Sequence, residues 1–199
     1  MTATTTTEKE IVLWLFKDFT RDYNPSTIAK RINKTRVGAF KALNELEKDV
    51  IAKGKNYGKA RFYEINYDEE YALKNVETLL MEESKRYQRW QDEFKDLYRY
   101  SEIVILFGSM VKNERKANDI DLLLVFDKKY NEKVNASIKD KDELLTKKIH
   151  PVKQTPDDIR MNILKEDKVI LDAIRTGIVL HGYEKYVELI KECHDQKIK

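Results

Sequence analysis

The stretch FGSMVKNERKANDID, residues 107–121, decides the fold of the C-terminal half of the chain. It begins at the end of an apolar run, Ile103 to Phe107, which predicts a buried strand. Gly108 and Ser109 then indicate a turn that opens a short helix. Asn118 to Phe126 is a second strand-like run. The stretch therefore predicts a strand, a turn with a short helix, and a second strand.

Two aspartates, Asp119 and Asp121, lie one residue apart on the second strand. Alternate residues of a strand share a face, so their carboxylates are expected side by side. Such a pair repels unless a cation lies between the charges, and Mg²⁺ favours one or two carboxylates together with phosphate oxygens. Gly108 lets a phosphate chain approach the backbone, and Ser109 adds donors at a helix start. The pattern predicts a divalent ion, Mg²⁺ or Mn²⁺, that joins the aspartates to a bound triphosphate. The alternative is a strand edge with two solvated acids, which the apolar neighbours disfavour.

This arrangement resembles the nucleotidyltransferases of the DNA polymerase β superfamily, especially the minimal type. Their signature is an apolar strand, Gly-Ser, a spacer, and then Asp, an apolar residue and Asp or Glu. Here Phe107-Gly108-Ser109 and Asp119-Ile120-Asp121 are separated by residues 110–118. The resemblance extends over residues 86–182, on the order of strands and helices. It implies a metal-dependent enzyme that transfers a nucleoside monophosphate from an NTP such as ATP to an acceptor hydroxyl, with two divalent ions held by three carboxylates.

The resemblance also assigns roles to individual residues. Gly108 and Ser109 would cradle the triphosphate, while Asp119 and Asp121 would bind Mg²⁺ and take part in catalysis. Two basic residues, expected on the helix after the turn, are candidates for further phosphate contacts: Lys112 and Arg115.

The third carboxylate of the family has no counterpart on the strand predicted from Lys148 to Val152. His150 lies where that acid is expected. An imidazole binds Mg²⁺ poorly but can act as a general base near neutral pH, so His150 is a catalytic candidate. The nearby acids are expected on helix surfaces: Asp142, Glu143, Asp157 and Asp158.

Two functions of different classes follow from these residues. In the first, the chain is a nucleotidyltransferase whose acceptor is a small molecule or a protein side chain, as for antitoxin members of the superfamily. In the second, the domain has lost catalysis and senses a nucleotide, which changes how the chain binds an operator as a transcription regulator. A purely structural adaptor is a third alternative.

The N-terminal residues 1–67 predict three helices and a hairpin. Apolar residues recur at helical spacing from Glu8 to Phe19, and Asn24-Pro25-Ser26 can start a second helix. Thr35 can cap a third helix that continues to Asp49. Its inward side chains are expected to be Val37, Phe40, Leu43, Leu46 and Val50.

The hairpin follows this third helix. Two β-like runs, residues 51–55 and 59–65, are joined by Asn56-Tyr57-Gly58, where Asn and Gly tolerate a tight turn. The order of elements resembles a winged helix-turn-helix, the fold of many prokaryotic transcription regulators. The resemblance makes residues 35–49 the recognition helix.

Positive charge is concentrated in this module. Between Ser26 and Ile65, ten Lys and Arg stand against four acids, a net charge of +6, whereas the whole chain carries +3. Positive charge on a helix and hairpin is the electrostatic footprint of duplex DNA binding. The alternative is a solvated basic face on a winged helix that binds protein. The residues predicted to contact DNA are Lys34, Arg36, Lys41, Lys48, Lys55, Lys59 and Arg61.

Residues 68–99 contain no Gly or Pro and predict one long connecting helix. Two series at seven-residue spacing trace a seam along it: Leu73, Leu80, Tyr87 and Phe94, and Val76, Glu83, Trp90 and Leu97. The seam predicts a homodimer that reads two DNA half-sites. The alternative is that the second half of this helix folds back onto the next domain.

The whole chain of 199 residues is long enough for two small domains. The expected class is α+β: a winged helix domain at 1–67, the long helix at 68–99, and a nucleotidyltransferase-like domain with a mixed sheet at 100–199. The apolar runs are strand-sized and the Thr-rich start lacks signal-peptide features, so we expect a cytoplasmic protein without a membrane partner. The lone Cys193 has no partner for a disulfide and no activating neighbours in sequence.

Overall fold

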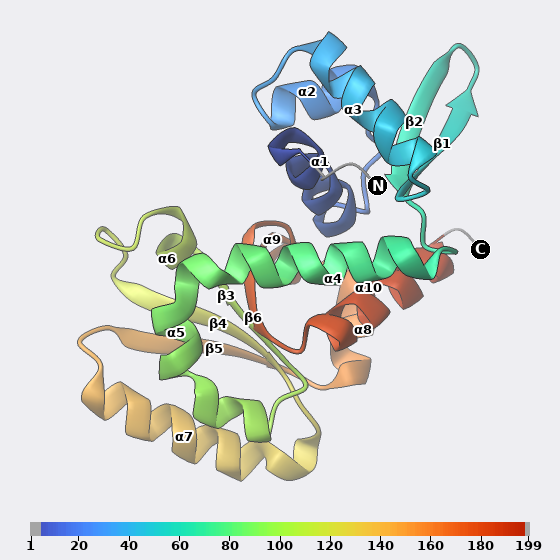
Figure 1. Cartoon of the computed structure of the whole chain (residues 1–199). Coiled ribbons are helices and arrows are strands. Elements are labelled where there is room, and N and C mark those ends of the chain that lie inside the picture. The colour runs from blue at the N-terminus through green and yellow to red at the C-terminus, as the bar shows by residue number, and fades with distance from the viewer. Residues whose placement is uncertain (1–4, 198–199) are drawn as a thin grey trace. The chain divides into compact units, whose positions relative to one another are not determined.

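The computed structural model describes residues 5–197, which form two compact units with their boundary between Leu79 and Leu80 (Figure 1). The N-terminal unit contains α1 (Thr6–Lys17), α2 (Pro25–Arg31), α3 (Arg36–Lys48), β1 (Ala52–Tyr57) and β2 (Ala60–Ile65). Helix α4 (Glu70–Ser84) begins in this unit and ends in the next. The order of three helices and an antiparallel hairpin is that of a winged helix, which confirms the predicted fold of this region.

Side-chain caps fix where the three helices begin. The Thr5 and Asn24 side chains accept backbone N–H groups at the starts of α1 and α2, and both caps are reciprocal capping boxes. Thr35 caps α3 through the Gly38 N–H, as predicted. The helices enclose an apolar core with the hairpin, and its fully buried members include Ile11, Phe16, Ile28, Leu43, Leu46 and Ile65.

Helix α3 differs from the expectation in the face that it buries. Leu43 and Leu46 are buried as predicted, together with Ala39 and Ala42. The predicted inward side chains Val37, Phe40 and Val50 are exposed instead, which corrects the expectation. The reason is the helical period: residues 39, 42, 43 and 46 make one continuous stripe, so positions 37 and 40 turn to solvent.

The hairpin turn also lies slightly later than expected. β1 continues through Asn56 and Tyr57, so the turn consists of Gly58 and Lys59. Gly58 has φ of 59°, a conformation that suits glycine, and Tyr57 pairs with Ala60 across the end of the ladder.

The expected single helix over residues 68–99 is wrong. α4 ends at Ser84 and is followed by the short segments η1 (Lys85–Tyr87), α5 (Gln88–Glu93) and η2 (Lys95–Arg99). Ser84 is buried, its hydroxyl donates to the Met81 carbonyl, and it lies 2.8 Å from the Tyr183 hydroxyl and from Gln91 Nε2. These hydrogen bonds replace continued helical ones where the chain bends. Trp90, Phe94 and Leu97 join the core of the C-terminal unit, so the alternative in which this half folds back is the observed one.

The C-terminal unit is a four-stranded mixed sheet with helices on both faces (Figure 1). Its further elements are β3 (Ile103–Phe107), α6 (Ser109–Lys112), β4 (Asp119–Val125), η3 (Lys128–Tyr130), α7 (Asn131–Leu144), β5 (Lys148–Gln154), α8 (Pro156–Leu164), α9 (Lys168–Thr176), β6 (Ile178–His181) and α10 (Tyr183–Lys197). The strand order is β5-β4-β3-β6, with β4 and β5 parallel and the other pairs antiparallel.

Alternation along the strands divides the apolar residues between the two faces of this sheet. One face, which includes Leu106 and Leu122, packs against α5, η2 and α7. On the other face α9 and α10 pack against β3 and α8 packs against β5. Cys193 of α10 is buried, and burial raises the pKa of its thiol to about 11. Between residues 5 and 197 no helix is long and apolar enough to span a membrane.

Candidate functional site

The two aspartates lie on the same face of β4, as the strand period predicts. Asp121 is paired in register with Phe107 of β3 on one side and with His150 of β5 on the other. Between them Ile120 is fully buried on the opposite face. The side chain of Asp119 is 39% exposed and that of Asp121 is 28% exposed, so both carboxylates reach solvent at the edge of the apolar core.

Gly108 forms a close cradle for the second carboxylate. Its φ is 72° and its ψ is −141°, which only glycine adopts readily. A Cβ at this position would overlap the Asp121 carboxylate. The Ser109 backbone N–H donates to that carboxylate, and α6 starts at Ser109 as expected. The turn and the Asp121 carboxylate therefore pack directly against each other. A glycine is required at position 108 because the backbone has a positive φ and because a side chain would overlap the carboxylate.

Burial raises the pKa of the Asp121 carboxyl, and the negative charge of Asp119 raises it further. His150 and the Ser109 N–H act in the opposite direction and leave a net upward shift. The ionised pair is therefore held at a cost in the absence of a cation, which is the electrostatic condition that favours binding of a positive ion.

His150 lies beside both carboxylates. Its Nδ1 is 3.1 Å from Asp119 Oδ2 and 4.0 Å from Asp121 Oδ1. The imidazole is 58% exposed, so it is accessible from solvent. In the register of β5 beside β4, His150 is paired with Asp121.

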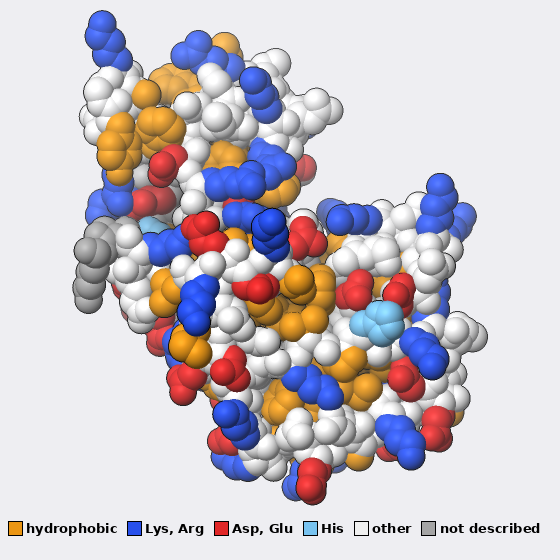
Figure 2. All heavy atoms as spheres, turned by 180° about the vertical axis from the view of Figure 1, so that it is seen from behind, with side chains coloured by type: hydrophobic (Ala, Val, Ile, Leu, Met, Phe, Trp, Pro, Cys, Tyr) orange, Lys and Arg blue, Asp and Glu red, His pale blue; other side chains and the backbone are white. Residues whose placement is uncertain are grey.

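A cleft of about 660 Å³ opens next to these residues. It is lined by Phe107, Gly108, Asp121, His150, Pro151, Val152, Lys168, Val169 and Asp172. On the molecular face drawn in Figure 2, acidic side chains border an exposed histidine, with apolar side chains nearby. The cleft thus combines charged groups at the turn with an apolar wall.

Lys168 and Asp172 were missed by the sequence-based prediction. They lie four residues apart on α9, so both reach the cleft from one face of that helix. No local motif marks them, because their place depends on how α9 packs against β3. They add a cation and a second acid to the lining of the cleft.

The oxygen donors of Asp119 and Asp121 fit a single Mg²⁺, which proteins hold by one or two carboxylates while phosphate oxygens and water complete the shell. Within residues 5–197, no three His, Cys, Asp or Glu side chains are grouped so as to hold an ion. The residues therefore do not fit the two-ion set of three carboxylates that the resemblance implies. Two carboxylates can hold one ion when its remaining ligands come from elsewhere.

The basic residues expected on the helix after the turn separate in the structure. α6 ends at Lys112, which is exposed, whereas Arg115 lies beyond the helix in the following turn. The expectation that both share this helix is therefore corrected, because Asn113 adopts an extended conformation and ends it.

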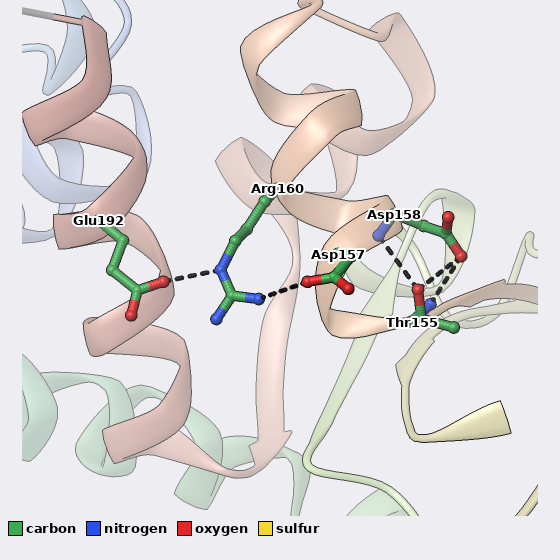
Figure 3. Close-up of polar contacts among 5 residues, drawn as sticks. All are labelled: Thr155, Asp157, Asp158, Arg160 and Glu192. Atoms are coloured by element: carbon green, nitrogen blue, oxygen red, sulfur yellow. Dashed lines mark hydrogen bonds and ion pairs between the residues drawn. The ribbon is translucent and has the colours of Figure 1, made fainter. Parts of the chain in front are cut away.

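The other nearby acids have structural contacts. Asp142 accepts the Ile149 N–H at 2.7 Å, and Asp158 caps α8 through Thr155. Asp157 contacts Arg160 of the same helix, and that guanidinium donates to Glu192 of α10 at 2.7 Å (Figure 3). None of these side chains lines the cleft beside Asp121.

The basic residues of the N-terminal unit fall into two groups. Three of the predicted DNA contacts are ion-paired: Lys48 with Glu45, Lys55 with Glu64, and Arg61 with Glu47. Among residues 5–197, the other four make no ion pair: Lys34, Arg36, Lys41 and Lys59. The positive charges of this second group are not balanced by an ion pair within the described part of the chain, so they are available to an anionic partner.

Comparison with known protein families finds a match in the C-terminal half of the chain. Residues 92–176 match the family described as Polymerase beta, Nucleotidyltransferase. No curated protein matches the sequence.

Among solved structures, AdcR of Streptococcus pyogenes, an adhesin competence repressor, is 16% identical, with a TM-score of 0.38 over 47% of this chain and 67% of that chain. A ZitR variant of Lactococcus lactis is 15% identical, with a TM-score of 0.38 over 48% of this chain and 63% of that chain. The chain thus spans about two thirds of the length of these two structures. The winged helix is identified by its own order of helices and strands.

The matched segment contains the Gly108-Ser109 turn, both aspartates of β4, and His150. Residues 92–176 are therefore similar to the polymerase β nucleotidyltransferase family, and in this chain the matched segment follows a winged helix.

Proposed function

We propose that the chain binds duplex DNA in the cytoplasm and that its C-terminal domain transfers a nucleoside monophosphate from an NTP to an acceptor hydroxyl. The observation that carries the catalytic part is the contact between the Gly108-Ser109 turn and Asp121, beside Asp119 on the same strand face. It supports the proposal because a glycine turn that can receive phosphate lies against a carboxylate that can bind a divalent ion, and Gly108 and Asp121 both line the cleft.

The residues of the site have separate roles in the proposed transfer. The turn at Gly108 and Ser109 holds the triphosphate, and Asp119 and Asp121 hold the divalent ion. A bound Mg²⁺ or Mn²⁺ neutralises charge on the phosphate oxygens. The acceptor oxygen attacks the α-phosphorus, the bond between the α-phosphorus and its bridging oxygen breaks, and pyrophosphate leaves.

His150 receives the proton of the acceptor hydroxyl in this proposal. Its Nδ1 lies 3.1 Å from Asp119 Oδ2, which orients the ring and leaves Nε2 as the proton acceptor. A base oriented by a carboxylate takes the place of the third acid on β5. The acceptor is either a protein side chain or a small molecule.

The experiment is label transfer. The full chain is incubated with each α-labelled NTP, Mg²⁺ or Mn²⁺, and cell extract, and labelled products are separated. The variant Asp119→Asn plus Asp121→Asn is expected to abolish labelling, while the control Asp140→Asn, an exposed carboxylate of α7, should label like the unmodified chain. Equal labelling by the unmodified chain and the double variant would refute the proposed site.

A second candidate function is a nucleotide-sensing transcription regulator. It is favoured by the single-ion fit and by the histidine at the place of the third carboxylate. Here the domain binds Mg²⁺ and NTP without transfer, and binding changes the affinity of the winged helix for DNA. A nucleotide-dependent change in duplex affinity without label transfer would select this function over the first.

Duplex binding itself rests on α3 and the unpaired cations around it. Arg36→Ala plus Lys41→Ala should weaken binding to duplex DNA and reduce the slope of log affinity against log salt by up to about 2, since each phosphate contact contributes about 0.9. The matched control is Lys139→Ala plus Lys165→Ala, two exposed lysines of the C-terminal unit. Unchanged affinity in the α3 variant would refute DNA contact by this helix.

A further inference from the structure

Helix α3 presents two large apolar side chains to solvent. Val37 is 64% exposed and Phe40 is 47% exposed. They are three residues apart on the helix, so they lie next to each other on one face. Lys41 and Asn44 continue the same face, one helical turn after each of them. The pair is therefore available for contact with a partner.

The charge around this pair specifies the partner. Arg36 and Lys41 are adjacent in sequence to Val37 and Phe40, and both are exposed. Neither makes an ion pair with any residue from 5 to 197. A surface that is apolar at its centre and basic at its margin fits a polyanion that also offers an apolar group. Duplex DNA does so in the major groove, where the C5-methyl group of thymine is exposed.

We propose that Val37 and Phe40 contact the methyl groups of two thymines in the major groove, so that the chain selects A·T-rich sites. This inference rests on the proposed binding of duplex DNA by α3 and adds the base preference. Side chains three residues apart on a helix are separated by about 5–6 Å, and base pairs are stacked about 3.4 Å apart. The two thymines are therefore one or two base pairs apart.

Asn44 supports the same preference. Its amide lies on the same helix face, and its Oδ1 accepts a hydrogen bond from the hydroxyl of the buried Tyr63 at 3.4 Å. An asparagine amide pairs with the N6 and N7 edge of adenine, which stands opposite thymine. The face thus offers an amide for adenine next to two apolar groups for thymine methyls.

The test removes only the methyl groups. Duplexes that bind the full chain are selected from a random-sequence library, and their thymines are replaced one at a time by deoxyuridine. Loss of one contacted methyl should weaken binding about fourfold, and loss of both about fifteenfold, because a buried carbon of this size contributes about 0.8 kcal/mol. The variant Val37→Ala plus Phe40→Ala should bind the thymine and deoxyuridine duplexes equally. The control Leu144→Ala, an apolar residue that is 78% exposed in the C-terminal unit, should keep the discrimination.

The outcomes separate the two proposals. Equal binding of thymine and deoxyuridine duplexes by the unmodified chain would overturn the inference, while weaker binding of both by Arg36→Ala plus Lys41→Ala would still support DNA binding by α3. Absence of duplex binding at every salt concentration would overturn both. Light scattering on the Val37→Ala plus Phe40→Ala variant gives a further check: a lower mass than that of the unmodified chain would assign the apolar pair to a contact between copies and overturn the inference.

Discussion

Substitution of the single residue Gly108 tests whether the turn beside Asp121 requires a glycine. Gly108→Ala forces an L side chain into a conformation with φ of 72° and places its Cβ against the carboxylate. We expect a loss of roughly 3 kcal/mol or more in the free energy of unfolding, together with loss of nucleotide binding. Denaturant unfolding and nucleotide titration measure the two effects.

The matched control is Gly58→Ala in the hairpin. Gly58 has a similar φ of 59°, but nothing lies within 4 Å of the site of its Cβ. Only the backbone strain remains, which is worth about 1–2 kcal/mol. Equal losses in the two variants would show that Asp121 does not press against the turn.

The Asp121 carboxyl makes the stability of the folded chain depend on pH. Because its pKa is raised in the folded state, the ionised carboxylate is less favourable in the native chain than in the unfolded chain. Asp121→Asn should therefore raise Tm at pH 7. The increase in Tm over the unmodified chain should shrink as pH falls through the pKa of Asp121 in the folded state. It should disappear below the pKa in the unfolded state, near 4, where the variant and the unmodified chain are both neutral at this position. Thermal unfolding at pH 7 and at the lower pH measures it.

Asp158 provides the opposite control. The Thr155 hydroxyl and N–H lower the pKa of its carboxyl (Figure 3). Its contribution is present above the unfolded pKa and is lost as pH falls through the folded pKa. Asp158→Asn should therefore lower Tm at pH 7, and a rise in Tm for both aspartate variants would contradict the proposed electrostatics of the site.

Part of the candidate site could be predicted from sequence because it depends on neighbours in the chain. Gly108 and Ser109 follow directly from a strand that stops, and the shared face of Asp119 and Asp121 follows from the strand period. The contact between His150 and Asp119 depends on which strands pair, and no local signal gives that register. Long-range pairing explains why the cleft residues of α9 were missed.

At the scale of elements, one guanidinium joins two helices. Arg160 of α8 donates to Glu192 of α10 at 2.7 Å and also contacts Asp157 of its own helix (Figure 3). Both partners are partly exposed, at 35% and 49%, so water and salt weaken the pair. A double-mutant cycle of Arg160→Met and Glu192→Gln should give a coupling energy below about 1 kcal/mol.

The comparison pair for this cycle lies within α10. Lys185 and Glu188 form an exposed contact at 2.9 Å three residues apart, so its coupling is expected to be weaker than that of Arg160 and Glu192. A coupling above about 2 kcal/mol for Arg160 and Glu192 would show that the contact between α8 and α10 is less exposed to solvent than its geometry indicates.

Elements with capping signals could be predicted, whereas their exact faces and breaks could not. Thr35 set the start of α3 and Thr155-Pro156 that of α8. The inward face of α3 was misassigned because Ala39 and Ala42, which carry little apolar surface, are the buried residues. The break after α4 has no Gly or Pro to announce it. It follows from tertiary hydrogen bonds between Ser84, Gln91 and Tyr183, which are distant in sequence.

At the scale of the whole molecule, the seam that predicted a homodimer is already used within one chain. Val76, Leu80, Trp90, Phe94 and Leu97 are all buried in the single copy. These five side chains are therefore not available to a second copy. We expect light scattering in the absence of DNA to give a mass near 23.6 kDa at micromolar concentration. Twice that mass would show that another surface holds two copies together.

The buried thiol of Cys193 can be used to measure how often α10 detaches from the rest of its unit. Cys193 is enclosed, and the burial that raises its pKa to about 11 keeps it almost entirely in the unreactive thiol form at neutral pH. A thiol reagent can therefore label the chain only at the moments when α10 detaches. The rate of labelling therefore measures how often α10 detaches, and no engineered probe is needed. If added NTP slows the labelling, binding of the nucleotide at the cleft stabilises α10, although this helix does not line the cleft.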